Sequence, residues 1–157
     1  MLSFMIFAAL PRMQAQTTAQ QPPQRFQPEA RADFIDARAA AAHIGVGVNV
    51  PASVYVRLGI VGAAGQAWRK GESTASGRID ALVRFVVDPF RESRWAPYAA
   101  GGLGAMYDGS EKWRGVIVGV LGIEGPATGH VVPAIEAGFG GGARFGVALR
   151  RAMRGRR

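Results

Sequence analysis

Apolar residues recur at every second position over most of the chain. The pattern is clearest near the C-terminal end, in AIEAGFGGGARFGVALR at residues 134–150. The odd positions of this stretch are apolar or glycine, whereas the even positions hold only glycine, alanine, glutamate and arginine. Alternation with a period of two is typical of a β-strand with two different faces. The pattern therefore predicts a strand with one apolar face and one face of glycine and charge.

Six segments of this kind predict an all-β chain. They cover residues 34–50, 54–68, 78–88, 95–107, 113–124 and 131–150. Turn residues separate them, including the hairpin signal Asp-Gly at 108–109. No helical period intervenes, so the segments predict an antiparallel up-and-down meander that closes into a barrel or folds into a sandwich.

The number of strands depends on the first and last segments, which are the longest. The alanine run 39–42 leaves the first half of the first segment open between strand and helix. A turn at 140–142 would divide the last segment, but its unbroken alternation favours a single strand. We therefore predict six strands, or eight if both long segments fold into hairpins. Six strands would leave the closure of a barrel incomplete.

Alternation alone does not tell which face of each strand is inside, because soluble and membrane barrels share the same period. Most segments have at least 11 residues, which is enough for a tilted strand to cross a bilayer. Glycine crowds the polar face, where a narrow barrel leaves little room for side chains. The same face carries charges of both signs, which can pair inside a barrel. These features favour a membrane β-barrel with its apolar faces toward lipid.

This arrangement predicts where two sets of residues lie. The interior charge network is expected to contain Arg57, Arg78, Asp80, Arg84, Glu124, Glu136 and Arg144. Aromatic residues at the ends of segments are expected to lie at the membrane interfaces, and these are Trp68, Trp95, Tyr107 and Trp113. The alternative interpretation is that these aromatic residues have no role at a membrane and simply cap an ordinary hydrophobic core.

Two stretches resemble the small outer-membrane β-barrel superfamily of Gram-negative bacteria. They are the hairpin WAPYAAGGLGAMYDGSEKW at 95–113 and the closing segment EAGFGGGARFGVALR at 136–150. The resemblance covers residues 34–150 and implies an antiparallel barrel of about eight strands in the bacterial outer membrane. It also implies a role as an anchor, an adhesin or a narrow pore, with outer-membrane lipid as the surrounding partner.

The rest of the chain predicts export. Residues 1–15 begin with an apolar run and end in small and polar residues, as a secretory signal peptide does. This mainly apolar run of ten residues is shorter than the roughly 20 that a membrane-spanning helix needs. Residues 16–32 are rich in Gln and Pro and predict a disordered linker. The β-barrel domain is expected at 33–150, followed by a basic tail at 151–157.

The formal net charge of +8 comes largely from the C-terminal end. Five arginines and no acidic residue lie between Arg150 and Arg157. This stretch predicts contact with anionic lipid headgroups. It lacks stacking aromatic residues and a base-reading helix, so no nucleic-acid partner is expected. The oligomeric state stays open.

No motif in the sequence predicts a cofactor or a metal. The chain has no cysteine, which excludes disulfides and thiolate sites. His43 and His130 lie in different segments without the spacing of metal ligands. The pattern Gly138-x-Gly140-x-x-Ala143 matches a dinucleotide fingerprint, but it lies inside a strand rather than at a strand-to-helix turn.

No catalytic residues are expected either. Glu124 and Glu136 are a conceivable acid–base pair, but pairing with interior arginines is the favoured interpretation. The sequence thus predicts a non-enzymatic outer-membrane β-barrel protein with a structural, anchoring or narrow-pore role. The alternative is a soluble exported β-barrel that binds a small apolar ligand between inward-facing apolar residues.

Overall fold

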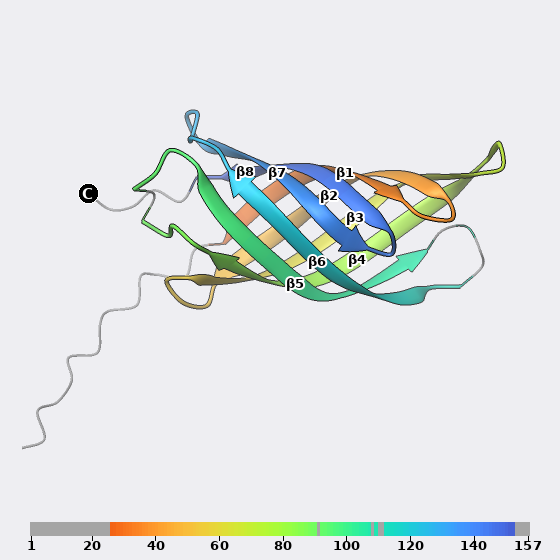
Figure 1. Cartoon of the computed structure of the whole chain (residues 1–157), viewed down its shortest axis with the longest axis horizontal. Helices are drawn as coiled ribbons and strands as arrows, with labels where there is room; N and C mark the ends of the chain where they lie inside the picture. Colours follow the sequence, from red (N-terminus) through yellow and green to blue (C-terminus); the bar gives the residue numbers. More distant parts are fainter. Residues whose placement is uncertain (1–25, 91, 108, 110–111, 153–157) are drawn as a thin grey trace, which may run out of the picture.

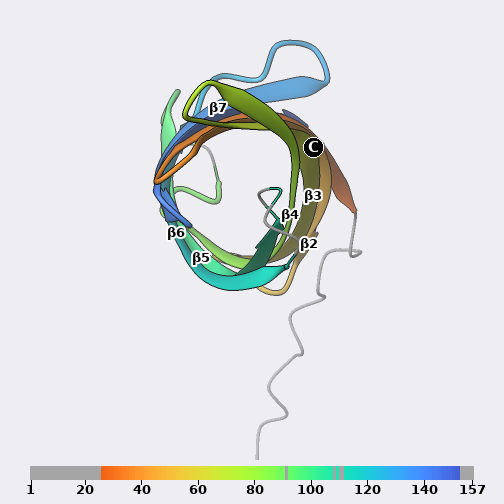
Figure 2. The ribbon, with the colours of Figure 1, turned by 90° about the vertical axis from the view of Figure 1, so that its right-hand side faces the viewer.

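The computed structural model describes residues 26–90, 92–107, 109 and 112–152, and these form one closed antiparallel β-barrel. Each strand is hydrogen-bonded to the next, and the first pairs with the last (Figures 1 and 2). The strands are β1 (Gln27–Asp36), β2 (Ala40–Pro51), β3 (Val56–Arg69), β4 (Glu72–Val86), β5 (Ala96–Tyr107), β6 (Arg114–Glu124), β7 (Val131–Gly140) and β8 (Ala143–Arg151). The predicted all-β up-and-down meander is confirmed. No helix long and apolar enough to cross a membrane occurs among these residues.

The barrel has eight strands because both long segments fold into hairpins, so the prediction of a single strand over 131–150 is wrong. Gly141 and Gly142 form the turn between β7 and β8, and Gly141 takes the positive φ of 88°. Phe139 pairs with Ala143 across this turn. Both partners have odd numbers, so odd residues stay on the outer face of both strands. A tight turn of this register leaves the alternation unbroken, which is why it resembled one strand.

Strand β1 begins at Gln27, so the predicted linker is wrong for residues 27–32. Every second residue of β1 from Gln27 to Asp33 is polar and points into the barrel, where each is at most 5% exposed. The outward residues of this part are Pro28, Ala30 and Ala32, whose weakly apolar side chains do not mark it as a strand beside the Gln- and Pro-rich stretch before it. The predicted signal peptide, residues 16–25 of the linker and residues 153–157 of the tail lie outside the described residues.

The two ends of the barrel differ in their connections (Figure 1). The end with the turns 37–39, 70–71 and 141–142 and the loop 108–113 is called the hairpin end. The opposite end, called the terminal end, holds the loops 52–55, 87–95 and 125–130 and the outer ends of β1 and β8. Lys70 and Gly71 both have positive φ, at 51° and 88°, as a two-residue hairpin with the twist of its strands requires.

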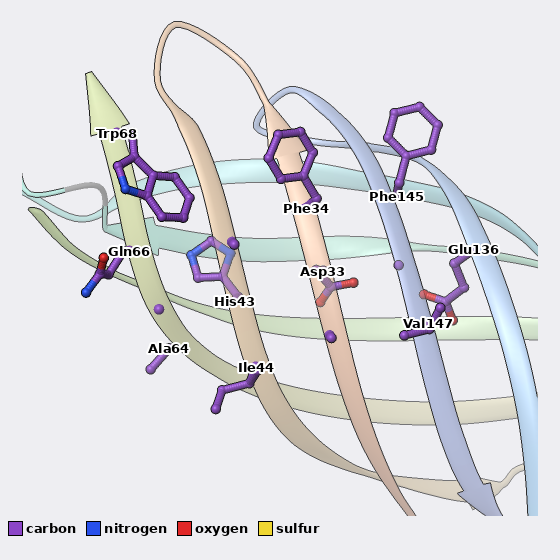
Figure 3. A pocket seen from close by; sticks show the side chains of 14 residues that line it. Asp33, Phe34, His43, Ile44, Ala64, Gln66, Trp68, Glu136, Phe145 and Val147 are labelled. Atoms are coloured by element: carbon purple, nitrogen blue, oxygen red, sulfur yellow. The ribbon is translucent and has the colours of Figure 1, made fainter. Parts of the chain in front are cut away.

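The outer face of the barrel is apolar. Ile44, Leu103 and Leu121 are 75%, 68% and 70% exposed on it. Figure 3 labels Phe34, Ile44 and Phe145 on the same face near the hairpin end. A soluble protein rarely exposes so large a continuous apolar surface. The alternative of a soluble cup with inward-facing apolar residues is therefore wrong.

Candidate functional site

The interior of the barrel is charged. The structure places all seven residues of the predicted network inside, each at most 8% exposed. The same interior holds further polar residues that the sequence analysis did not assign to it: Gln27, Glu29, Arg31, Asp33, His43, Asn49, Ser76, Tyr98 and Arg150. Buried charges of this kind are tolerated only when they are paired and hydrogen-bonded. The arrangement of these side chains therefore determines whether the interior is stable.

Interior glycines make room for these large side chains. Asp80 lies directly across from Gly104, and Tyr98 lies across from Gly122. A Cβ atom on Gly104 would meet the carboxylate of Asp80, and one on Gly122 would meet the ring of Tyr98. The same pairing of a large inward residue with glycine joins Glu29 to Gly47, Asp33 to Gly146, Asn49 to Gly59 and Arg144 to Gly138. A Cβ atom on five of these six glycines, all but Gly138, would meet the side chain beside it, so glycine and charge share one face.

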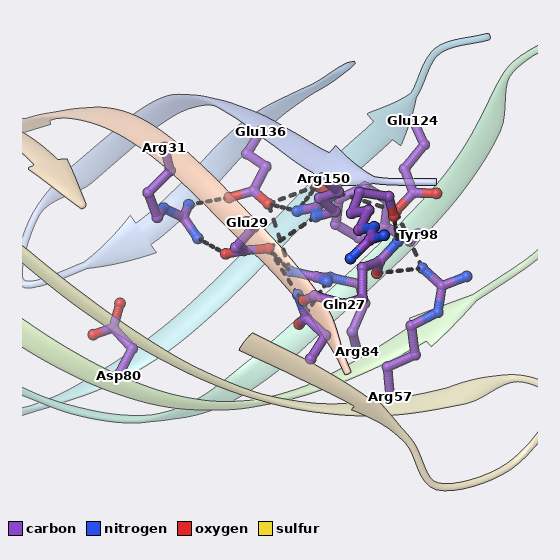
Figure 4. Close-up of polar contacts among 12 residues, drawn as sticks. Gln27, Glu29, Arg31, Arg57, Asp80, Arg84, Tyr98, Glu124, Glu136 and Arg150 are labelled. Atoms are coloured by element: carbon purple, nitrogen blue, oxygen red, sulfur yellow. Dashed lines mark hydrogen bonds and ion pairs between the residues drawn. The ribbon is translucent and has the colours of Figure 1, made fainter. Parts of the chain in front are cut away.

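Arg150 is the centre of the network in the terminal half of the barrel (Figure 4). Its Nε lies 2.9 Å from Glu29 Oε2, and its Nη1 lies 3.1 Å from Glu124 Oε1. Its Nη2 donates to Glu136 Oε1 at 2.6 Å and to the Tyr98 hydroxyl oxygen at 3.0 Å. One guanidinium therefore contacts three carboxylates that come from β1, β6 and β7.

Arg150 was predicted both as the last residue of the barrel domain and as the first arginine of the stretch that contacts headgroups, and the second prediction is wrong. Arg150 lies within β8 and is 0% exposed, whereas Arg151 points outward. The strand alternation already contained the signal, because residue 150 has the same parity as Glu136 and Arg144. Arg150 was left out of the predicted network because it also begins the run of arginines at 150–157.

A continuous chain of ion pairs runs from this centre toward the hairpin end. Arg31 pairs with Glu136 and with Asp33, the latter at 2.9 Å. Asp33 pairs with Arg144 at 3.1 Å. Asp80 then accepts from Arg144 at 3.3 Å and from Arg78 at 2.5 Å. Ion pairs in the interior therefore connect the strands of the wall along most of the barrel.

Two further arginines come close to each other in the terminal half. Arg57 and Arg84 are direct partners on β3 and β4. Arg57 lies 3.3 Å from Glu124, and Arg84 lies 3.4 Å from Glu29. The guanidinium of Arg84 also lies 5.1 Å from the centroid of the Tyr98 ring, a cation–π distance. Glutamates on both sides thus offset the repulsion of these two cations.

The buried charges nearly cancel. The buried residues of the described barrel include six arginines and five carboxylates, a difference of one charge. These are Arg31, Arg57, Arg78, Arg84, Arg144 and Arg150 against Glu29, Asp33, Asp80, Glu124 and Glu136. A nearly neutral, paired interior is the arrangement in which buried ions cost least.

Apolar side chains complete the interior. Val61, Leu82 and Val118 form a cluster with Ala100 and Val120 on the wall made by β3 to β6. A second cluster at the hairpin end contains Ile35, Ala41, Ala67 and Met106, each at most 2% exposed. This second cluster lies between the ion-pair network and the opening of the barrel at that end.

Some polar atoms near the hairpin end have no protein partner. His43 Nε2 lies 2.8 Å from Ser76 Oγ, and Ser76 donates to the Tyr107 carbonyl oxygen. By contrast, His43 Nδ1, Arg78 Nε and Nη1, and Asp80 Oδ1 are buried without a hydrogen bond. Buried atoms of this kind are usually satisfied by ordered water. No group of three or more metal-ligating side chains occurs in the part of the chain that the structure describes.

The four predicted interfacial aromatic residues lie at the two ends of the barrel. Trp68, Tyr107 and Trp113 lie at the hairpin end, and Trp95 lies at the terminal end. The three tryptophans are 42–57% exposed on the outside. Tyr55, Phe85 and Phe90 also lie exposed at the terminal end, and the first two stack with their ring centroids 6.0 Å apart. These three residues were not predicted, although their place near segment ends is the same signal.

An apolar outside, a paired and charged inside and aromatic residues at both ends define a class of protein, the β-barrel that crosses a membrane with its strands. The chain superposes on the de novo designed protein TMB2.3 with a TM-score of 0.56 and 16% identity, over 87% of this chain and 99% of that one. It superposes on the N-terminal β-barrel domain of Pseudomonas aeruginosa OprF with a TM-score of 0.55 and 13% identity, over 80% and 96%. No protein-family model and no curated protein matches the sequence. The predicted resemblance to small outer-membrane barrels is thus confirmed at the level of the fold.

Proposed function

We propose that this chain is a non-enzymatic, non-conducting barrel of the bacterial outer membrane, where it serves as a structural anchor. The observation that carries the proposal is the orientation of the strands, with apolar side chains outward and paired charges inward. This orientation suits a hydrocarbon surrounding, because lipid accepts apolar side chains and excludes the charges. The signal-like residues 1–15 and the fold shared with the OprF domain support export to that membrane.

The anchoring role is favoured over a narrow pore because the interior is filled. Side chains that line a water-filled channel are reached by solvent, whereas the arginines and carboxylates of the network are at most 8% exposed. Arg150 and its three carboxylates occupy the terminal half, and the cluster around Met106 closes the hairpin end. Ions could pass only if several of these contacts broke together.

A single reconstitution experiment tests both parts of the proposal. The chain would be purified in detergent, incorporated into vesicles that enclose a small charged dye, and washed at high salt. We expect the chain to stay with the vesicles, because its apolar outer face is solvated by lipid, and we expect dye efflux no faster than from empty vesicles. Fluorescence measures the efflux, and a known porin serves as the positive control.

Retention in the vesicles and dye efflux test the two parts of the proposal independently. Recovery of folded chain in the wash without detergent would contradict membrane residence. Retention in the vesicles together with dye efflux would contradict the anchoring role and favour the narrow pore.

A further inference from the structure

The outer face of the barrel is hollowed near the hairpin end (Figure 3). The hollow, called the hairpin-end groove, has a volume of about 610 Å³ and crosses β8, β1, β2 and β3. Its floor is formed by the small side chains of Ala32, Ala42 and Ala64. Its walls are formed by the larger apolar side chains of Phe34, Ile44, Trp68 and Phe145. A second hollow of about 670 Å³ adjoins it over β3 and β4 and shares Ile44 and Ala64 with it. In a membrane, such a trough is open to the acyl chains of lipid.

Three cations lie at the hairpin end, beyond the residues that line the groove. Arg38 is in the turn after β1, and Arg69 and Lys70 are at the end of β3, next to Trp68 in the groove wall. The three side chains also line one common hollow at the barrel mouth. All three are exposed, and none forms an ion pair with another described residue. They differ in this from the interior arginines, every one of which is paired.

The hairpin end has a small excess of basic residues. Among its described residues it carries Arg38, Arg69, Lys70, Lys112 and Arg114 against Asp36 and Glu72, and the sequence adds Asp108 and Glu111 to the same end. Unpaired cations at the edge of an apolar membrane face attract anionic lipid headgroups. The indole of Trp68 adds an amphipathic side chain of the kind that lies at headgroup level.

We propose that the hairpin-end groove binds one molecule of an anionic phospholipid. One acyl chain lies on the alanine floor between Phe34 and Ile44, and the phosphate lies at Arg38, Arg69 and Lys70. The inference rests on the proposed membrane location and adds a specific lipid site to it. A second copy of the chain is a poorer occupant, because a symmetric contact would bring these cations against each other.

Tryptophan quenching by brominated lipid tests the site. The full chain would be reconstituted into phosphatidylcholine vesicles that contain a minor fraction of phosphatidylglycerol. Bromine would be on the acyl chains of phosphatidylglycerol in one set and on an equal fraction of phosphatidylcholine in the other. Two single-tryptophan variants report on the two ends: Trp95→Phe with Trp113→Phe retains Trp68, and Trp68→Phe with Trp113→Phe retains Trp95.

We expect brominated phosphatidylglycerol to be enriched about fivefold beside Trp68, which is the factor expected from the attraction of about one surface cation. Trp95 should be quenched equally by both lipids. The combined change Arg38→Gln, Arg69→Gln and Lys70→Gln should remove the enrichment, whereas Arg94→Gln with Arg151→Gln at the terminal end should leave it. Filling the groove with Ala64→Phe should also remove it without loss of membrane insertion.

The outcomes separate this inference from the proposed function. Equal quenching of Trp68 by the two lipids would overturn the lipid site while the membrane location stands. Absence of quenching of both tryptophans by either lipid would overturn the location as well. A change of oligomeric state on Ala64→Phe, without loss of enrichment, would assign the groove to a second copy and overturn the lipid site.

Discussion

Replacing Arg150 with methionine is expected to destabilise the barrel by about 3–5 kcal/mol, because it removes one partner from a buried ion network. Arg150 contacts Glu29, Glu124 and Glu136 within 3.1 Å, and the substitution would leave these carboxylates short of a cation. Methionine has a similar length and no charge, so the loss of packing is small. The free energy of unfolding would be measured by urea titration in detergent micelles, with tryptophan fluorescence as the signal.

The next residue supplies the control. Arg151 belongs to the same strand but is exposed on the outer side, and no described ion pair involves its side chain. The change Arg151→Met is expected to alter stability by less than about 0.5 kcal/mol. If Arg150→Met does not fold, adding Glu136→Gln should restore folding, because it removes one of the uncompensated charges. Equal effects of the two methionine substitutions would show that the interior network does not stabilise the barrel.

Adding a single carbon at Gly102 is expected to cost about 3 kcal/mol, at the upper end for an overpacked interior. Gly102 lies on the inner side of β5, opposite Leu82 of β4. A Cβ atom there would come against the carbonyl oxygen of Ala81 and within 3.0 Å of the Leu82 Cα atom. Both are backbone atoms, so the neighbouring strand would have to move. The change Gly102→Ala would be measured by the same urea titration.

Gly62 is the matched control, because it is a strand glycine on the outer face. A Cβ atom on Gly62 would have nothing within 4 Å. The change Gly62→Ala should therefore be neutral or stabilise by up to about 1 kcal/mol, because alanine restricts the unfolded chain more than glycine does. A cost at Gly62 equal to that at Gly102 would contradict the idea that interior glycines are there to make room.

The sequence predicted the period, the faces and the class of fold because alternation is a local property. It did not predict the strand count, since Phe139 and Ala143 face each other across a turn that preserves parity. It missed the start of β1 because the outward residues there, Pro28, Ala30 and Ala32, are small or weakly apolar. Alternation therefore fails where the outward side chains are too small to mark the apolar face.

The partners within the network were beyond sequence reasoning. Arg31 and Glu136 are 105 residues apart, and only closure between β1 and β8 brings them together. The odd or even position of a residue in its strand shows whether its charge points inward. The position of that charge along the barrel axis depends on the register of every hairpin. The partners of Arg150 and Tyr98 were therefore beyond prediction until that register was known.

The central claim, that the apolar face meets lipid, is tested most directly by a spin label on that face. The chain has no cysteine, so Leu103→Cys provides one labelling site at a residue that is 68% exposed. In reconstituted membranes we expect frequent collisions of the label with oxygen, which dissolves in hydrocarbon, and few with a water-soluble nickel chelate. Frequent collisions with the nickel chelate at this position would place the face in water and contradict the account.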